Sequence, residues 1–242
     1  MAGFWLLVWQ VLALVVGERL LLPSPLEVAQ RLSELVVQAG FWATVAHTLA
    51  RIAGGFLAGM LTGALAAAGA ARWRLVDALV TPLVGAVRAA PVVSFIILVL
   101  IWVDAAWLAL VVSALMVLPV AYADVLAGFR AREGALLEVA HVFRLPWTRR
   151  VTAIDLPALL PFLAAACRVG IGLAWKSGVA AEVIGLPAGS VGERLYDAKL
   201  LLESADVFAW TLVIVALSSL MERGVVLALR RAPGATPAAV AP

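Results

Sequence analysis

Three basic residues stand inside long apolar segments, where a charge is costly and needs a partner or a cavity. Arg168 and Lys176 occupy one such segment at multiples of four residues, a spacing that keeps them on one side of a helix. Arg88 lies in another, just before the helix-breaking Pro91. A cationic lining of this kind can bind an anion. The further candidates for a pathway or gate are Pro91, Ser94, Trp175 and Glu182.

The same charges have a second interpretation, in which they pair inside the protein. Lys176 can pair with Glu182, and Arg88 or Arg168 can pair with Asp77 or with backbone carbonyls. The residue types and spacing leave both interpretations open.

Motifs for catalysis are missing from the sequence. It contains no G-x-x-x-x-G-K-[S/T] phosphate loop, no G-x-S-x-G nucleophile elbow and no His or Cys cluster with metal-ligand spacing. His47 and His141 are isolated, and Cys167 is the only cysteine. We therefore expect no enzyme, no metal and no cofactor. Any uphill process would draw its energy from an ion gradient or from a partner protein.

The elements that hold these charges are expected to be membrane-spanning helices. Of the 242 residues, 64% are hydrophobic and 14% are charged, and the mean hydropathy is +1.07. Soluble domains carry roughly 25% charged residues, so the composition indicates an all-α integral membrane protein with about six spans. The net charge of +3 comes from basic residues between apolar segments. That placement is typical of cytoplasmic loops and argues against nucleic-acid binding.

The order of apolar segments predicts one transmembrane domain over residues 1–231 and a disordered tail over 232–242. Pro91 divides the third segment into two helical pieces, and Pro25 begins an amphipathic helix expected at the membrane surface. Basic residues are concentrated on one side of the spans, which predicts that this side and both termini are cytoplasmic. The expected spans cover residues 4–22, 52–71, 75–102, 105–123, 157–181 and 207–229.

Gly55, Gly59 and Gly63 recur every four residues in the second expected span. Small residues at this spacing make a flat strip on a helix, against which another helix backbone can pack closely. We therefore predict a helix-packing role for them.

A polar stretch, residues 138–157, separates two apolar segments. Apolar residues at helical spacing predict a short helix there, with one apolar face that ends at Pro146. Arg144, Arg149 and Arg150 surround it with positive charge. Such a helix can seat in a groove of another protein. The alternative is an ordinary loop whose charges only set the topology.

The same stretch resembles the EAA signature of bacterial ABC importer permeases. Glu138, Ala140, Ile154 and the pair Leu156–Pro157 stand at the spacing of that signature. Two positions depart from it: Val139 replaces the first alanine and Arg144 replaces the glycine. Further segments are similar to the nitrate/sulfonate/taurine-type permeases, namely LPSP at 22–25, the segments 88–102, 115–129 and 172–185, and the G-x-x-G of Gly189 and Gly192.

This resemblance implies a type I ABC importer permease in the bacterial inner membrane. It implies a homodimer, two cytoplasmic ATPase subunits and an extracytoplasmic substrate-binding protein. The loop at about 129–157 would hold a coupling helix between spans four and five. The residues carried over to ATPase coupling are Glu138, Val139, Ala140, Phe143, Arg144, Ile154, Leu156 and Pro157. The substrate would be a small organic or inorganic anion or a vitamin precursor.

Two other classes compete with this interpretation. A self-sufficient secondary transporter or channel would show inverted repeats and intramembrane acids for ion coupling, whereas no clear repeat is visible and the most central charge is Arg168. A membrane scaffold would not require any intramembrane charge.

Overall fold

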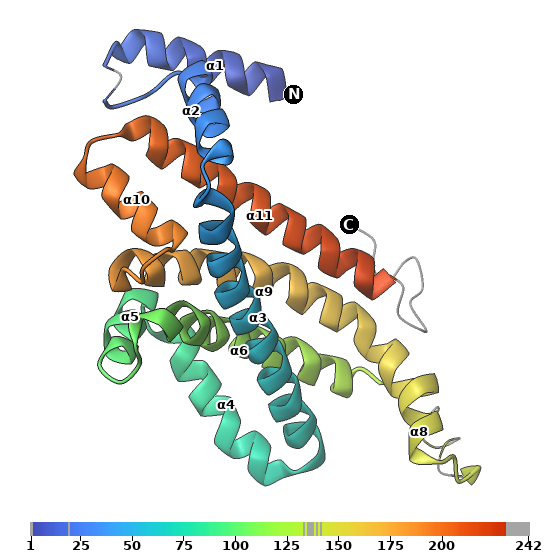
Figure 1. Ribbon diagram of the computed structural model, residues 1–242. Helices are drawn as coiled ribbons and strands as arrows, with labels where there is room; N and C mark the ends of the chain where they lie inside the picture. Colours follow the sequence, from blue (N-terminus) through green and yellow to red (C-terminus); the bar gives the residue numbers. More distant parts are fainter. Residues whose placement is uncertain are drawn as a thin grey trace.

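The computed structural model describes residues 2–18, 20–132, 134, 138, 140 and 142–230, and within these ranges its regular structure is helical (Figure 1). Val139 lies outside the described residues, as does the expected tail over 232–242. The elements are α1 (Ala2–Val16), α2 (Pro25–Val37), α3 (Phe41–Arg72), α4 (Arg74–Ala89), α5 (Val92–Leu100), α6 (Ala105–Arg130), α8 (Trp147–Arg150), the π-helical turn η1 (Val151–Asp155), α9 (Leu156–Gly185), α10 (Val191–Leu200) and α11 (Ser204–Arg230).

Four helical stretches are long and apolar enough to cross a membrane. They are α3, α6, the continuous run from α8 through α9, and α11. The pair α4 and α5, bent by 103° at Pro91, makes a fifth candidate. The all-α membrane class is therefore confirmed, as is the break at Pro91. The remaining expected span corresponds to α1, whose 15 residues reach only about 22 Å, less than the roughly 30 Å of a hydrocarbon core.

The centre of the molecule is formed by α3, α6 and α9. Gly55, Gly59 and Gly63 of α3 face the backbone of α6 so closely that an added Cβ would lie 2.4 to 2.6 Å from carbonyl oxygens of α6. In α9, a Cβ at Gly178 would lie 2.6 Å from the hydroxyl of Ser113. Lipid tails are as apolar as the helices, so close backbone packing takes over from the hydrophobic effect in joining them.

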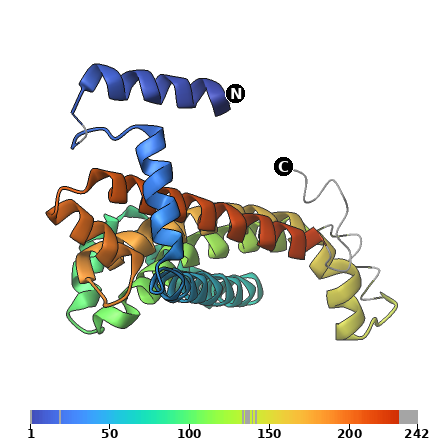
Figure 2. The same ribbon diagram turned by 45° about the horizontal axis from the view of Figure 1, so that its top comes forward.

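The shorter helices begin at recognisable caps. Ser24 and Glu27 form a reciprocal capping box at the start of α2, with Pro25 in its first turn. Asp104 caps α6 and Ser190 caps α10 through their side chains. In both views α1 lies at one edge of the molecule (Figures 1 and 2). Its Trp9 donates to the carbonyl of Pro23 at 3.0 Å and stacks on Phe208 of α11.

The molecule has two different ends. Near α8, the last turns of α3 and α6 meet the start of α9 around a cavity of about 480 Å³ lined by Arg72, Arg132 and Arg150. At the other end lie α10, the end of α9 and the first turns of α3 and α11 (Figure 1). One continuous helix, α9, thus connects the two ends.

Candidate functional site

The loop after α6 is closed at its base by an ion pair. Arg132, just after α6, donates to Asp155 of η1 at 2.5 Å, and the Arg150 guanidinium lies 3.6 Å from the same carboxylate. Arg132 also donates to the carbonyl of Phe129 and lies over its ring. Asp155 is buried, so the pair holds the two ends of the loop together where water is scarce.

Beyond this base, the described residues of the loop include one buried position and several exposed ones. Glu138, Ala140 and Val142 are helical, and Ala140 is buried while Glu138 is exposed. The side chains of Val142, Phe143 and Trp147 are 73 to 75% exposed. Large apolar groups with this exposure form a patch that a monomeric protein would normally cover.

Arg144 takes a left-handed backbone conformation with φ +46°. The next residue, Leu145, donates its N–H to the carbonyl of Ala140 at 3.0 Å, which closes the turn. This is the position where the resembled signature has glycine, the residue that adopts such angles without strain. The sharp turn is therefore retained, at a strain of roughly 1 kcal/mol in the arginine.

The last part of the signature marks the change from η1 to α9. Ile154 lies half-buried in the π-helical turn, and Leu156 and Pro157 begin α9. The N–H of Leu156 reaches back to the carbonyl of Val151, the wider spacing of a π-helix. Pro157 has no N–H to donate, so regular α-helical bonding cannot continue through this point.

At the other end of α9, the carboxylate of Glu182 is fully buried. The hydroxyl of Thr48 lies 2.8 and 3.0 Å from its two oxygens, and the N–H of Gly192 donates to it at 3.2 Å. The guanidinium of Arg51 lies 3.7 Å away. The same Thr48 hydroxyl accepts the N–H of Val191 at 2.9 Å. One side chain of α9 thus joins α3 to the first turn of α10.

The G-x-x-G of Gly189 and Gly192 makes this junction possible. Gly189 has φ +70°, and a Cβ at Gly192 would lie 2.3 Å from the Cβ of Glu182. The start of α10 can approach the carboxylate only because no side chain stands between them.

Comparisons with known proteins agree with these features. Residues 59–231 match the family model described as binding-protein-dependent transport system inner membrane component. The chain belongs to this family. The match covers the α3–α6 packing from Gly59 onward, the loop and all of α9 with Glu182, whereas Thr48 and Arg51 precede it.

Individual relatives carry different substrate names. The putative aliphatic sulfonates transport permease protein SsuC of Bacillus subtilis is 27% identical over 89% of this chain and 78% of its own length. The taurine transport system permease protein TauC of Escherichia coli is 26% identical over 89% and 80%. The riboflavin transport system permease protein RibX of Chloroflexus aurantiacus is 26% identical over 84% and 78%. The chain is thus a multi-pass permease of the ABC importer class. Its sequence identity to all three relatives is nearly the same, at 26 to 27%.

In this permease the predicted pathway residues fall into separate places. Arg88, Pro91 and Ser94 are exposed around the bend between α4 and α5, and Arg88 lines a cavity of about 530 Å³ with Tyr122 and Arg130. Arg168 lies half-buried in the middle of α9, outside that cavity.

Two neighbouring residues of α9, Trp175 and Lys176, point to different surroundings. Trp175 is 2% exposed and packs between α3, α6 and α9, whereas Lys176 is exposed. An aromatic ring expected to line a pathway is therefore part of the permease core.

The two acids considered as partners from the sequence pair with basic residues other than those expected. Glu182 pairs with Arg51 of α3, and Asp77 pairs with Arg130 at 2.8 Å and also accepts from Tyr122. Arg51 stands just before the span expected over residues 52–71, but it lies inside α3, one turn after Thr48. The pairs Arg132–Asp155 and Arg31–Asp206 were also missed, because their partners are separated by 23 and 175 residues.

Removing the acceptor at the Glu182 junction should destabilise the permease. Glu182→Ala leaves Arg51, Thr48 and the N–H of Gly192 without their carboxylate, a loss of about 3 to 5 kcal/mol. Thr48→Val, which preserves shape but removes the hydroxyl, should cost about 1 to 3 kcal/mol. Thermal unfolding in detergent measures both. Lys199→Ala, at an exposed site of α10, serves as the control. Melting curves for Glu182→Ala and Lys199→Ala that coincide would contradict the role of the junction.

Replacing Arg144 by glycine should relieve the strained turn. Arg144→Gly is expected to raise the protection of the loop against limited proteolysis, because glycine adopts the left-handed angle without cost. Arg144→Val, which tolerates this angle least, should have the opposite effect. Faster cleavage of the glycine variant than of the wild type would contradict the assigned conformation.

Proposed function

We propose that the chain forms the translocation pathway of an ABC importer and is driven by ATPase subunits that dock on residues 138–157. The observation that carries this proposal is the exposed patch of Val142, Phe143 and Trp147, bordered by Arg144 and Arg149. A protruding apolar patch with basic surroundings fits a groove on another protein. The sequence has no nucleotide-binding motif of its own, so energy from ATP would enter through such a partner.

The contacts at the two ends of α9 suggest how a displacement would travel. The Arg132–Asp155 pair links the base of the loop to the end of α6 and to the start of α9. From Leu156 the helix runs without interruption to Gly185, and Glu182 near its end holds α3 and α10. A push on the docked loop would therefore move α9 as one body and reach the opposite end of the molecule.

The orientation follows from the distribution of charge. The α8 end carries Arg72, Arg130, Arg132, Arg149 and Arg150, and an excess of basic residues marks the cytoplasmic side. The α10 end would then face outward, toward an extracytoplasmic binding protein. We further propose that two copies form the pathway as a homodimer, with the C-terminus in the cytoplasm. A cytoplasmic N-terminus requires in addition that α1 completes a sixth span.

For the substrate, a small organic anion of the sulfonate type is favoured over a vitamin precursor. Arg88, Arg168 and Lys176 supply positive charge within or beside the spans. Trp175, which would have held an aromatic vitamin ring, is buried in the core. The named substrates of the relatives include aliphatic sulfonates, taurine and riboflavin, so the charges supply the preference.

Truncating the exposed aromatic residues should release the ATPase. Phe143→Ala with Trp147→Ala removes the centre of the patch, and loss of buried aromatic anchors commonly weakens an interface by about 2 kcal/mol or more. We expect co-purification with the ATPase to fall on the order of tenfold or more and uptake in proteoliposomes to stop. Trp107→Ala is the matched control, because that exposed ring lies at the start of α6, at the other end of the molecule. Undiminished co-purification would rule out docking on this patch.

Neutralising Arg168 should impair transport without releasing the ATPase. A charge at this depth of α9 is costly to maintain, which favours a role in the passage of an anion. Arg168→Gln is expected to lower uptake about tenfold in proteoliposomes, while Arg168→Lys retains a charge and much of the activity. ATPase co-purification serves as the control for assembly. Equal uptake by both variants and the wild type would assign Arg168 to packing alone.

A further inference from the structure

The cavity of about 480 Å³ at the α8 end lies where α3 and α6 end and α9 begins (Figure 1). The last turns of α3 and α6 line it together with α8, η1 and the first turn of α9. None of the pathway residues named above belongs to its lining. Because α3, α6 and the run from α8 through α9 are long and apolar enough to cross a membrane, the cavity lies at the level where these helices leave the lipid.

The lining changes from apolar to basic along the helices that form it. Ala68 and Leu159 lie about one turn inside the ends of α3 and α9, on the membrane side of the cavity. Arg72 ends α3 and Arg150 ends α8, on the side away from the membrane. A ligand that fills this cavity must therefore have an apolar part directed into the membrane and a charged part directed out of it.

The acidic residue in the lining is already paired. Asp155 is buried and accepts from Arg132 at 2.5 Å. Arg132 also donates to the carbonyl of Phe129, and its side chain is largely buried between the two acceptors. This pair satisfies itself and leaves little of either charge for a ligand.

Two further arginines of the cavity keep donors available. Arg150 lies 3.6 Å from Asp155, which is too far for a hydrogen bond, and its buried Nε has no hydrogen-bond partner among the described residues. Arg72 forms no ion pair or side-chain hydrogen bond within the part of the chain that the structure describes. Two guanidinium groups with open donors, beside an acid that is already paired, favour an oxyanion over an ammonium group.

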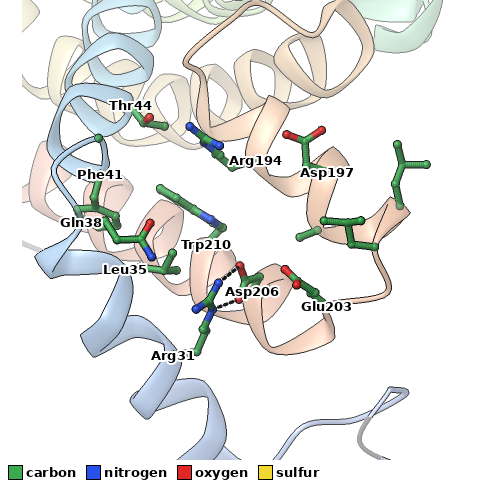
Figure 3. Close-up of a pocket in the computed structure, with 14 residues that line it drawn as sticks. Arg31, Leu35, Gln38, Phe41, Thr44, Arg194, Asp197, Glu203, Asp206 and Trp210 are labelled. Atoms are coloured by element: carbon green, nitrogen blue, oxygen red, sulfur yellow. Dashed lines mark hydrogen bonds and ion pairs between the residues drawn. The ribbon is translucent and has the colours of Figure 1, made fainter.

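The cavity of about 430 Å³ at the α10 end lacks this bias. Asp197 and Glu203 line it together with Arg194, so the acids there offset the base (Figure 3). Its other arginine, Arg31, is already bound to Asp206 (Figure 3). A net positive charge above an apolar lining is therefore a property of the cavity at the α8 end, and not of both ends of the molecule.

We propose that the cavity at the α8 end binds an anionic phospholipid, with its phosphate at the arginines and an acyl chain along the apolar side. Arg72 and Arg150 would donate to the phosphate oxygens, whose geometry matches the fork of a guanidinium group. Basic pockets between membrane helices bind anionic headgroups in this way. A zwitterionic lipid would add an ammonium group beside these arginines, where Asp155 is already paired. A free phosphate ion would leave the apolar side of the cavity uncovered.

A lipid bound here would connect parts of the loop base that the protein itself leaves separate. The Arg132–Asp155 pair joins the end of α6 to η1, whereas a phosphate between Arg72 and Arg150 would join the end of α3 to α8. Trp147, at the edge of the same cavity, would be held in place by that contact. The site requires only this chain and a lipid, so it does not depend on the proposed docking of an ATPase.

Native mass spectrometry of the purified full chain in detergent tests the site. The probes are phosphatidylglycerol, phosphatidylethanolamine with the same acyl chains, and inorganic phosphate. The first lipid bound to each chain should be phosphatidylglycerol, held about tenfold or more tightly than phosphatidylethanolamine, because its net negative charge is retained at the two arginines. An excess of inorganic phosphate should not displace it.

Charge variants with matched neighbours locate the site. Arg72→Gln and Arg150→Gln should each reduce the affinity for phosphatidylglycerol to near that for phosphatidylethanolamine. Arg74→Gln and Arg149→Gln are the controls, because both residues carry the same charge at the same end without lining the cavity. Ala68→Phe keeps the arginines but fills the apolar side, and it should also weaken the binding of phosphatidylglycerol.

Three results would overturn the proposal. Equal affinity for the two lipids, or equal losses in the Arg149 and Arg150 variants, would reduce the effect to general surface charge. Displacement of phosphatidylglycerol by inorganic phosphate, with no effect of Ala68→Phe, would assign the cavity to a free anion. Thermal unfolding in lipid-free detergent verifies that each variant is folded. Since no ATPase is present, failure here and failure of docking on residues 138–157 are distinguishable.

Discussion

The fold depends on how one fully buried carboxylate is satisfied. Glu182 accepts from Thr48 and from the backbone of Gly192 and lies beside Arg51. A buried acid is stable only when its oxygens are hydrogen-bonded and its charge is offset. Meeting that condition brings α3, α9 and the start of α10 to one point. The contact also requires glycine at position 192, because a Cβ there would collide with Glu182.

The same constraint bears on the coupling through α9 that is proposed above. The Arg132–Asp155 pair holds the chain directly before the first turn of α9, and Glu182 holds its last turns. Small residues along its length allow α3 and α6 to pack closely. A helix fixed at both ends moves as a body and cannot easily bend away from a load at one end. In the proposed coupling, the π-helical turn η1, with its wider hydrogen bond, would be the place where the direction of such a load changes.

Much of this architecture was predictable because it rests on local patterns. Apolar segments, Pro91 and the four-residue glycine spacing predicted the long helices, the bend between α4 and α5, and the strip on α3. The ion pairs were not predictable in the same way. Lys176 is closer in sequence to Glu182 than Arg51 is, yet Arg51 pairs with it, because α3 and α9 pack side by side and Lys176 points outward. Pairing across 131 residues (182 − 51) depends on tertiary packing, which periodicity does not encode.

Arg144 shows how a departure from a pattern can leave the geometry unchanged. The arginine takes the left-handed angle that glycine would have taken, and the N–H of Leu145 still reaches Ala140. The strain of roughly 1 kcal/mol is small beside the free energy that a docked partner can contribute. Arg144 also places a positive charge at the edge of the exposed patch of Phe143 and Trp147. Rim charges mainly raise association rates and select partners. In the docking proposed above, Arg144 would therefore favour a partner groove with an acidic border, at little cost to the turn that presents the patch.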